Sequence, residues 1–280
     1  MDFRTPEGQQ RYDELVADAA RVVVGLDFDG VLSPIVPDPA RAVIHPDGPR
    51  TLVALADQVR GVAVITGRPA RQAIALGDLD EVGQDLAERD RAIHLLGQYG
   101  NERWSSKERR VVSPRPPKGL SSFMSELPDL LRRHDAADAF VEEKGLAVAV
   151  HTRRLPDPAG AFERLLPVLT EAAARYDLGV EPGRMVIEVR APGMHKGEAL
   201  RTIHRELDGH GVIFAGDDLG DIEAFRAVEE LREQGCPGLL ICSGSEEQKA
   251  LVELSDIVVD GPEGVLSLLR QFARDAAASG

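Results

Sequence analysis

Two aspartates separated by one residue, Asp27 and Asp29, are the side chains of this sequence most suited to chemistry. They follow the apolar run 22–26 and precede Gly30. A continuous β-branched run predicts a strand buried on both faces, as in a parallel sheet. Ligands of such sheets bind beyond the carboxyl ends of the strands, and period-two geometry directs both carboxylates to one side. Because two unpaired carboxylates repel each other, we expect a divalent cation between them; the alternative is a solvated, Asp-rich turn.

Three further groups stand where a predicted strand ends or a helix begins. They are Thr66, Lys196 and the acidic set Asp217, Asp218 and Asp221. Together with the first pair they offer carboxylates for a cation, a hydroxyl and an ammonium for phosphate oxygens, and a nucleophile. Phosphoryl transfer needs this combination of charge neutralisation and a positioned attacking group.

Each of these residues also has a simpler interpretation. Thr66 and Asp221 could each cap a helix, and Lys196 could be a solvated helix residue. Arg68 is more typical of a structural ion pair, and we leave it out of the catalytic set.

The elements expected to position these groups alternate between strand and helix at both ends of the chain. The predicted strands of this part are 22–26, 61–65, 92–96, 212–215, 238–242 and 257–259. The predicted helices are 9–20, 49–59, 69–76, 197–207, 221–234 and a closing helix to about residue 276. This alternation predicts an α/β fold with a right-handed, doubly wound, mostly parallel sheet.

The alternation of single strands and helices stops in the middle of the chain. A linker-like piece, 113–119, precedes a helix over 120–133 and two strands over 139–143 and 146–151. A second helix over 159–176 then precedes two strands over 178–181 and 184–189, which are joined by a turn at Pro182-Gly183. We interpret residues 112–190 as an inserted α+β cap domain. Residues 1–111 and 191–280 would then form the catalytic core.

Composition excludes several classes of partner. The 280 residues carry 33 Lys and Arg against 47 Asp and Glu, a net charge of −14, without any basic block. This argues against nucleic acid and against an anionic membrane surface, although a local basic pocket could still bind a small anion. Neither a signal-type leader nor an 18-residue apolar run is present. The two cysteines, Cys236 and Cys242, are too few for a disulfide framework or zinc site, so we expect free thiols in a monomeric, cytoplasmic protein.

Four motifs in a fixed order carry a resemblance to a known family. DFDG at 27–30, TGR at 66–68, a lone Lys196 before a helix and GDDLGD at 216–221 resemble the motifs of the haloacid dehalogenase superfamily of phosphatases. DFDGVLSPI, VEEKGLAVAVHTR and IEVRAPGMHKGEAL further resemble trehalose-6-phosphate phosphatases, over most of residues 22–265.

The resemblance implies a role for each residue of the four motifs. Asp27 would be the nucleophile that becomes an aspartyl phosphate, and Asp29 would protonate the leaving sugar oxygen and later activate water. Thr66, Lys196 and the main-chain N–H of Gly30 would bind the phosphoryl oxygens.

The resemblance also implies a cofactor and its ligands. Asp27, the main-chain carbonyl of Asp29 and Asp217 would hold one Mg2+, with Asp218 or Asp221 completing or orienting its shell.

In the insert, five polar residues match positions that the family uses around the sugar: Glu142, Lys144, His151, Arg153 and Glu188. A hydroxyl-rich disaccharide needs such a lining, because buried polar groups left unpaired penalise the wrong sugar. The alternative is that these charges form a solvated sheet face.

The chain departs from the family pattern at three positions. Tyr99 stands where the family carries a histidine, and Gly220 and Ile222 replace the usual Thr and Glu beside the last motif aspartate. The predicted function is Mg2+-dependent hydrolysis of trehalose 6-phosphate. One alternative is the same chemistry on a glycosylglycerate or pseudo-disaccharide phosphate. The other is a non-catalytic sugar-phosphate sensor, disfavoured because the key carboxylates and the lysine are all present.

Overall fold

The computed structural model describes residues 3–183, 185–193, 195–244 and 249–279 and divides the chain into two compact units. The first unit combines Met1–Ser113 with His195–Gly280, and the second is Pro114–Met194. The first unit is therefore assembled from both ends of the chain, around an insert.

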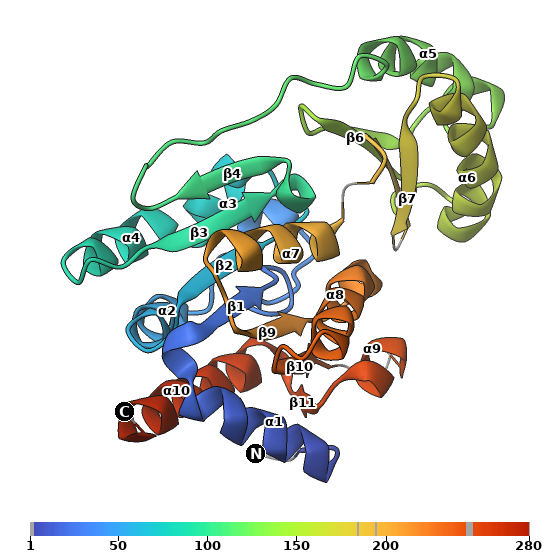
Figure 1. The fold of residues 1–280 in the computed structure, drawn as a ribbon. Helices are drawn as coiled ribbons and strands as arrows, with labels where there is room; N and C mark the ends of the chain where they lie inside the picture. The colour runs from blue at the N-terminus through green and yellow to red at the C-terminus, as the bar shows by residue number, and fades with distance from the viewer. Residues whose placement is uncertain (1–2, 184, 194, 245–248, 280) are drawn as a thin grey trace. The chain divides into compact units, whose positions relative to one another are not determined.

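A seven-stranded sheet runs through the first unit in the order β11-β10-β9-β1-β2-β3-β4 (Figure 1). The strands are β1 (Val22–Leu26), β2 (Gly61–Ile65), β3 (Ile93–Gly97), β4 (Glu102–Ser105), β9 (Gly211–Gly216), β10 (Gly238–Ser243) and β11 (Ile257–Val259). Neighbours pair in parallel except β3 and β4, which are antiparallel. The predicted α/β fold with a mostly parallel sheet is confirmed.

Helices cover both faces of this sheet because successive apolar side chains of each strand point to opposite sides. The core on one face includes residues of α1 (Pro6–Ala17), α2 (Gly48–Ala56), α3 (Ala70–Leu76), α4 (Leu79–Ala87) and α10 (Gly261–Ser279). The core on the other face includes residues of α7 (Lys196–Glu206), α8 (Ile222–Glu233) and α9 (Lys249–Leu254). In β1, for example, Val24 and Leu26 belong to the first core, and the backbone at Gly25 approaches Leu200 of α7.

The second unit has a core of its own. Its antiparallel sheet has the order β5-β6-β8-β7, with β5 (Phe140–Glu143), β6 (Ala147–His151), β8 (Val186–Arg190) and β7 (Gly179–Gly183). Helices α5 (Leu120–Arg133) and α6 (Pro158–Ala174) share a buried apolar cluster with Val148, Val150, Ile187 and Val189 of the two central strands. The alternate residues of those strands face away from this cluster.

The structure corrects one predicted turn and adds two α-helices and one β-strand in the described part of the chain. Pro182 and Gly183 lie inside β7 and not in a turn, which an edge strand tolerates because one side of its backbone carries no ladder bonds. The added elements are α4, β4 and α9. The ends of the remaining elements shift by a few residues, as helix ends commonly do.

No helix in the described part of the chain has an apolar stretch long enough to cross a bilayer. Cys242 is buried in β10, Cys236 is half-buried, and both are free thiols.

Candidate active site

The site begins at the carboxyl end of β1. Asp27 follows Leu26 directly, and its N–H donates to the carbonyl of Ala215 in β9 at 3.0 Å. Parallel pairing of β1 with β9 places the ends of both strands at the same edge. Residues that follow the two strands therefore meet, although almost two hundred positions separate them in the sequence.

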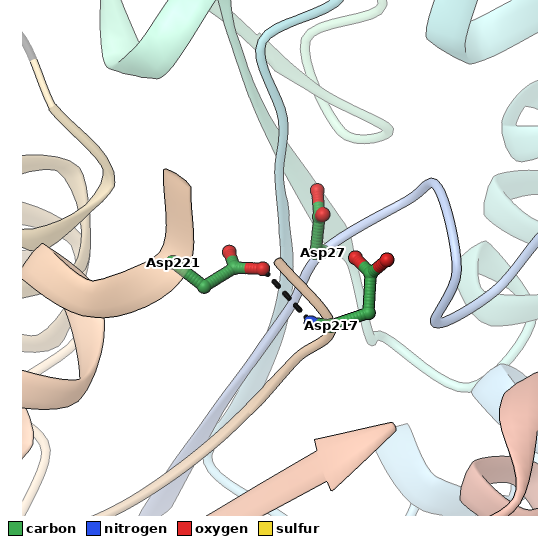
Figure 2. Close-up of side chains that lie close together, drawn as sticks. All are labelled: Asp27, Asp217 and Asp221. Carbon is green, nitrogen blue, oxygen red and sulfur yellow. Dashed lines mark hydrogen bonds between the residues drawn. The ribbon is translucent and has the colours of Figure 1, made fainter. Parts of the chain in front are cut away.

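Three carboxylates gather at this edge (Figure 2). Asp27, Asp217 and Asp221 each have an oxygen within 4.8 Å of the other two. Asp221 Oδ2 accepts hydrogen bonds from the N–H of Asp217 at 2.9 Å and of Asp218 at 3.3 Å, which fixes the turn after β9. Asp221 is completely buried and Asp27 is 4% exposed.

Lys196 completes the cluster from the first position of α7. Its Nζ lies 2.8 Å from Asp27 Oδ2 and 2.7 Å from Asp221 Oδ1, and the residue is 4% exposed. The preceding residue, His195, caps the helix by accepting from the N–H of Glu198. Lys196 is thus a buried counter-charge, and the alternative of a solvated helix residue is wrong.

Burial and mutual repulsion set the protonation of this cluster. Burial raises the pKa of Asp27 well above its usual range and that of Asp217 to about 8, and burial likewise raises the pKa of Asp221; the other carboxylates add to each rise, and the Lys196 ammonium opposes it. Burial disfavours the charge of Lys196, but Asp221 and Asp27 outweigh it and raise the lysine pKa. The lysine stays protonated, and one ammonium does not balance three buried carboxylates.

Thr66 lies at the carboxyl end of β2 and is buried. Its Oγ1 accepts a hydrogen bond from the N–H of Arg68 at 3.1 Å. It does not cap α3: the N–H of Ala70, at the start of that helix, donates to Glu102 Oε2 at 2.6 Å. The threonine hydroxyl therefore keeps its own proton available for donation.

Asp29 turns toward Arg68 and not toward the three-carboxylate cluster. Arg68 Nε donates to Asp29 Oδ2 at 2.7 Å, and Arg68 Nη2 donates to Asp29 Oδ1 at 2.6 Å. The arginine side chain is 10% exposed and that of Asp29 is 38% exposed. The structural ion pair expected for Arg68 is therefore present, and its partner is the predicted acid–base residue.

Two residues of the acidic motifs have local structural roles. Asp218 accepts from the N–H of Gly220 at 2.9 Å and shares a capping box with Asp221 at the short helix Leu219–Asp221, so among the described residues it lies outside the cluster. Asp221 combines the expected capping role with a place in the cluster. Gly30 has a φ of +73°, and an added Cβ there would lie 2.2 Å from Asp217 Oδ2. Only glycine lets the loop after β1 approach Asp217 this closely.

The polar residues predicted in the insert lie on and beside the second sheet. Glu142, Ala149, Glu188 and Glu181 pair in one row across the four strands, on the face away from the apolar cluster. Lys144 Nζ contacts Glu188 Oε2 at 2.6 Å, and His151 Nε2 contacts Glu142 Oε2 at 3.0 Å. Arg153 follows β6 and is exposed.

Sequence reasoning missed two contributors to these clusters. Arg190 is buried in β8, with Nη2 at 2.9 Å from Glu181 and Nη1 at 3.5 Å from Glu188. Ser243 Oγ, at the end of β10, donates to the Gly30 carbonyl at 2.5 Å. Ser243 stands where a strand ends, as the aspartates do, so the same reasoning could have located it. Arg190 lies two residues after Glu188 in the same strand, and this period-two spacing was the signal that could have located it.

Comparison with known proteins finds similar sequences and a similar fold. The family model for trehalose-phosphatase matches residues 131–257. Trehalose-6-phosphate phosphatase of Escherichia coli is 27% identical over 208 residues, which cover 73% of each chain. The structure of the C-terminal domain of trehalose-6-phosphate phosphatase from C. albicans superposes with a TM-score of 0.75 at 20% identity, covering 98% of each chain.

A longer relative is more similar in sequence. An uncharacterized glycosyl hydrolase of Mycobacterium tuberculosis is 34% identical over 236 residues, 80% of this chain, but the chain spans only 17% of that protein.

The core fold defines the class: a haloacid dehalogenase-like hydrolase from Bacteroides thetaiotaomicron superposes on it with a TM-score of 0.61 at 14% identity, covering 89% of this chain and 98% of that one, so the fold is haloacid dehalogenase-like. Within that class the chain is similar to trehalose-6-phosphate phosphatases in part of its sequence and in its fold.

Proposed function

We propose that this protein is a Mg2+-dependent phosphatase that hydrolyses trehalose 6-phosphate to trehalose and phosphate through an aspartyl phosphate on Asp27. The observation that supports this most is the convergence of Asp27, Asp217, Asp221 and Lys196 at one strand edge. Similarity to trehalose-6-phosphate phosphatases supports the substrate. That the protein is cytoplasmic and monomeric and binds neither nucleic acid nor membranes stays a prediction.

Asp27 is the attacking group in this proposal. Its Oδ1 accepts from the N–H of Phe28 at 2.7 Å, which fixes the carboxylate plane at the end of β1. The carboxylate attacks phosphorus and the bond to the sugar oxygen breaks, while Asp29 donates a proton to that oxygen. Water then attacks the aspartyl phosphate, Asp29 takes a proton from the water, and phosphate leaves as Asp27 is restored.

The residues fit a hard divalent cation. Three carboxylates within reach of one another provide the oxygen ligands that Mg2+ prefers. Burial and then mutual repulsion raise their pKa values, and one lysine does not offset this. Asp27, Asp217 and the Asp29 carbonyl would hold the ion, with Asp221 behind them; Asp218, which caps a short helix, is the weaker candidate. When bound, Mg2+ supplies charge neutralisation for the phosphoryl oxygens.

Thr66, Lys196 and the Gly30 N–H are proposed to bind the phosphoryl group. The Thr66 hydroxyl can donate its proton, and Lys196 adds a positive charge beside the nucleophile. The Gly30 N–H already donates to the Ser33 carbonyl at 2.7 Å, so it contributes only if it is shared.

Glu142, Lys144, His151, Arg153 and Glu188 are proposed to bind the sugar hydroxyls. The paired charges of Lys144 with Glu188 and of His151 with Glu142 hold these side chains in place before any ligand is present. Preorganised donors and acceptors discriminate against a sugar that leaves one of them unpaired.

An activity assay on purified protein tests the proposal. Wild-type protein should release phosphate from trehalose 6-phosphate in Mg2+, and EDTA should abolish this until Mg2+ is restored. Asp27→Asn should lower kcat by at least about a thousandfold, because loss of a nucleophile removes the covalent route. Asp85→Asn, an exposed acid on α4, is the matched control and should retain full activity. Phosphate release by Asp27→Asn near the wild-type rate would contradict the covalent mechanism.

The alternative substrates are separated by a panel. Tyr99 in place of the family's histidine keeps other sugar phosphates open as substrates. A glycosylglycerate phosphate or pseudo-disaccharide phosphate turned over faster than trehalose 6-phosphate would contradict the substrate assignment and leave the chemistry intact. If no phosphomonoester is turned over in the presence of Mg2+, the alternative of a non-catalytic sugar-phosphate sensor is favoured.

A further inference from the structure

We propose that Arg68 is a positioning residue that holds the Asp29 carboxylate where it exchanges protons with the sugar oxygen and with water. This inference rests on the proposed function, in which Asp29 is the acid and base. It assigns to Arg68 a role that acts through Asp29 and requires no contact with substrate.

The contact between the two side chains is bidentate. Both carboxylate oxygens of Asp29 are bound, one by Nε at 2.7 Å and one by Nη2 at 2.6 Å. A planar guanidinium that meets a carboxylate in this way fixes its orientation as well as its charge. A single ammonium in place of the guanidinium would fix only one point.

The guanidinium is itself held from several sides. Arg68 Nη1 donates to the Pro39 carbonyl at 2.9 Å, and the guanidinium carbon lies 5.6 Å from the centre of the Phe28 ring. The main chain of Arg68 is fixed too, because its N–H donates to Thr66 Oγ1 and its carbonyl accepts from the N–H of Gln98 at 2.8 Å. Because the turn at Thr66 holds the main chain of Arg68, it also fixes the guanidinium that binds Asp29.

The two side chains differ in exposure, as a positioning role requires: the acid must be accessible and the residue that holds it need not be. The arginine side chain is 10% exposed, whereas the Asp29 side chain is 38% exposed. Each carboxylate oxygen has two lone pairs, so the bidentate contact leaves one on each oxygen for proton exchange. A pair serving stability alone has no need of an accessible acid.

The two half-reactions demand a carboxylate that stays in one place. Asp29 must donate a proton to the sugar oxygen in the first step and accept one from water in the second. Positioned acid–base groups typically contribute about 10²–10⁴ in rate, and the contribution depends on geometry. A fixed bidentate contact returns Asp29 to the same position for both steps.

Two substrates separate this role from a structural one. The first is trehalose 6-phosphate, whose leaving oxygen needs a proton, and the second is 2,4-dinitrophenyl phosphate, whose phenolate leaves without one. The variants are Arg68→Gln, Arg68→Lys, Asp29→Asn and the double variant Arg68→Gln with Asp29→Asn. Arg103→Gln is the matched control, because Arg103 also makes a two-point contact with a carboxylate, that of Glu206, away from the site.

Arg68→Gln should lower kcat for trehalose 6-phosphate by about 10- to 100-fold, a part of the usual acid–base contribution, with KM unchanged. Arg68→Lys should fall between Arg68→Gln and wild type. In rapid-mixing experiments, the first-turnover burst of dinitrophenolate should stay within about threefold of wild type, since that step needs no proton. Steady-state turnover of the aryl phosphate should slow, because hydrolysis of the aspartyl phosphate needs Asp29 as base.

The double variant is decisive. If Arg68 acts through Asp29, Arg68→Gln should have little further effect once Asp29 is Asn, and the two losses should not multiply. An equal loss of burst rate and sugar-phosphate turnover in Arg68→Gln, multiplied losses in the double variant, or an unchanged rate would each overturn the inference while the wild type remains active. A wild-type protein inactive on both substrates would instead overturn the proposed function and the inference with it.

Discussion

A single buried ammonium joins the two acidic motifs of this protein. Lys196 contacts Asp27 after β1 and Asp221 after β9, at 2.8 and 2.7 Å. Taking three charges out of water is costly unless each is compensated, and loss of one member leaves the others buried and unpaired. The lysine is thus a stability element as well as a candidate ligand for phosphate.

Lys196→Met should lower the free energy of unfolding by about 3–5 kcal/mol, the cost of breaking a buried ion pair from one side. Protonation of the remaining aspartates limits the loss. Urea denaturation at pH 7 without divalent cation measures the change.

Two companion variants make that experiment specific. Lys118→Met, at an exposed position, should change the free energy of unfolding by less than about 0.5 kcal/mol. Adding Asp221→Asn to Lys196→Met should recover part of the loss, because one unpaired charge is removed. A Lys196→Met protein as stable as wild type would contradict the paired arrangement.

At the scale of residues, the sequence predicted well which side chains come to the same edge of the sheet. It predicted less well which partner each of them binds there. The expectation that ligands bind beyond the carboxyl ends of parallel strands brought Asp27, Thr66 and Asp217 to one edge of the sheet. It could not separate Asp218 from Asp221, because two acids three positions apart after a strand look equivalent until the turn is built. It also treated Arg68 apart from Asp29, because bringing two loops to one edge of the sheet does not show which of their side chains pair.

At the scale of elements, the loop after β1 is shaped by close approach. Gly30 adopts a φ of +73°, and a Cβ at this position would lie 2.2 Å from Asp217 Oδ2. The loop is held there by Ser243, whose hydroxyl donates to the Gly30 carbonyl. Three strands, β1, β9 and β10, therefore determine the position of one carboxylate.

Gly30→Ala should displace Asp217 and raise the Mg2+ concentration needed for half-maximal activity by about tenfold or more, equivalent to a loss of at least about 1.4 kcal/mol of binding. It should also cost about 1–2 kcal/mol in stability through left-handed backbone strain. Mg2+ titration of activity and thermal unfolding measure the two effects separately.

Gly235→Ala provides the comparison for Gly30→Ala. Gly235 has a φ of +85°, and an added Cβ there would meet no atom within 4 Å. This variant should lose similar stability while its Mg2+ dependence stays that of wild type. Equal Mg2+ dependence in both variants would mean that Asp217 tolerates the added methyl group.

The predictability of the elements follows the strength of their apolar pattern. Strands β1, β2 and β11 and helix α5 match their predicted ranges, because continuous apolar runs define the strands and a strong apolar stripe defines the helix. The polar segment ERWS of β4 has no such run and is a strand only because it pairs with β3. Helix α4 contains Gly83 and begins after Asp78 in the left-handed region, so local propensity argued against it.

At the scale of the whole molecule, buried histidines couple stability to pH. Burial lowers the pKa of His204, with a smaller contribution from His210, and burial likewise lowers that of His94. The unfolded chain takes up protons near the ordinary histidine pKa of about 6.5, whereas the folded chain does so only at lower pH. These histidines therefore reduce the stability of the folded state as the pH falls below about 6.5.

His204→Gln should reduce the loss of stability between pH 7 and pH 5, because one of the groups that must stay neutral is removed. His94 remains and keeps part of the slope. Urea denaturation of both proteins at several pH values in this range measures the difference. The same slope in the two proteins would show that His204 titrates alike in the folded and unfolded states.

The order of strands in the first sheet has a consequence for how the protein is made. β1 lies between β2 and β9, and roughly 190 residues, including the whole insert, separate the start of β1 from that of β9. At a ribosome speed of about 5–20 residues per second, the growing chain waits on the order of ten to forty seconds with one edge of β1 unpaired. During that interval Asp27 has neither its lysine nor its acidic neighbours. The nascent chain therefore lacks the carboxylate cluster, and β1 stays exposed to wrong strand partners, until the last third of the chain leaves the ribosome.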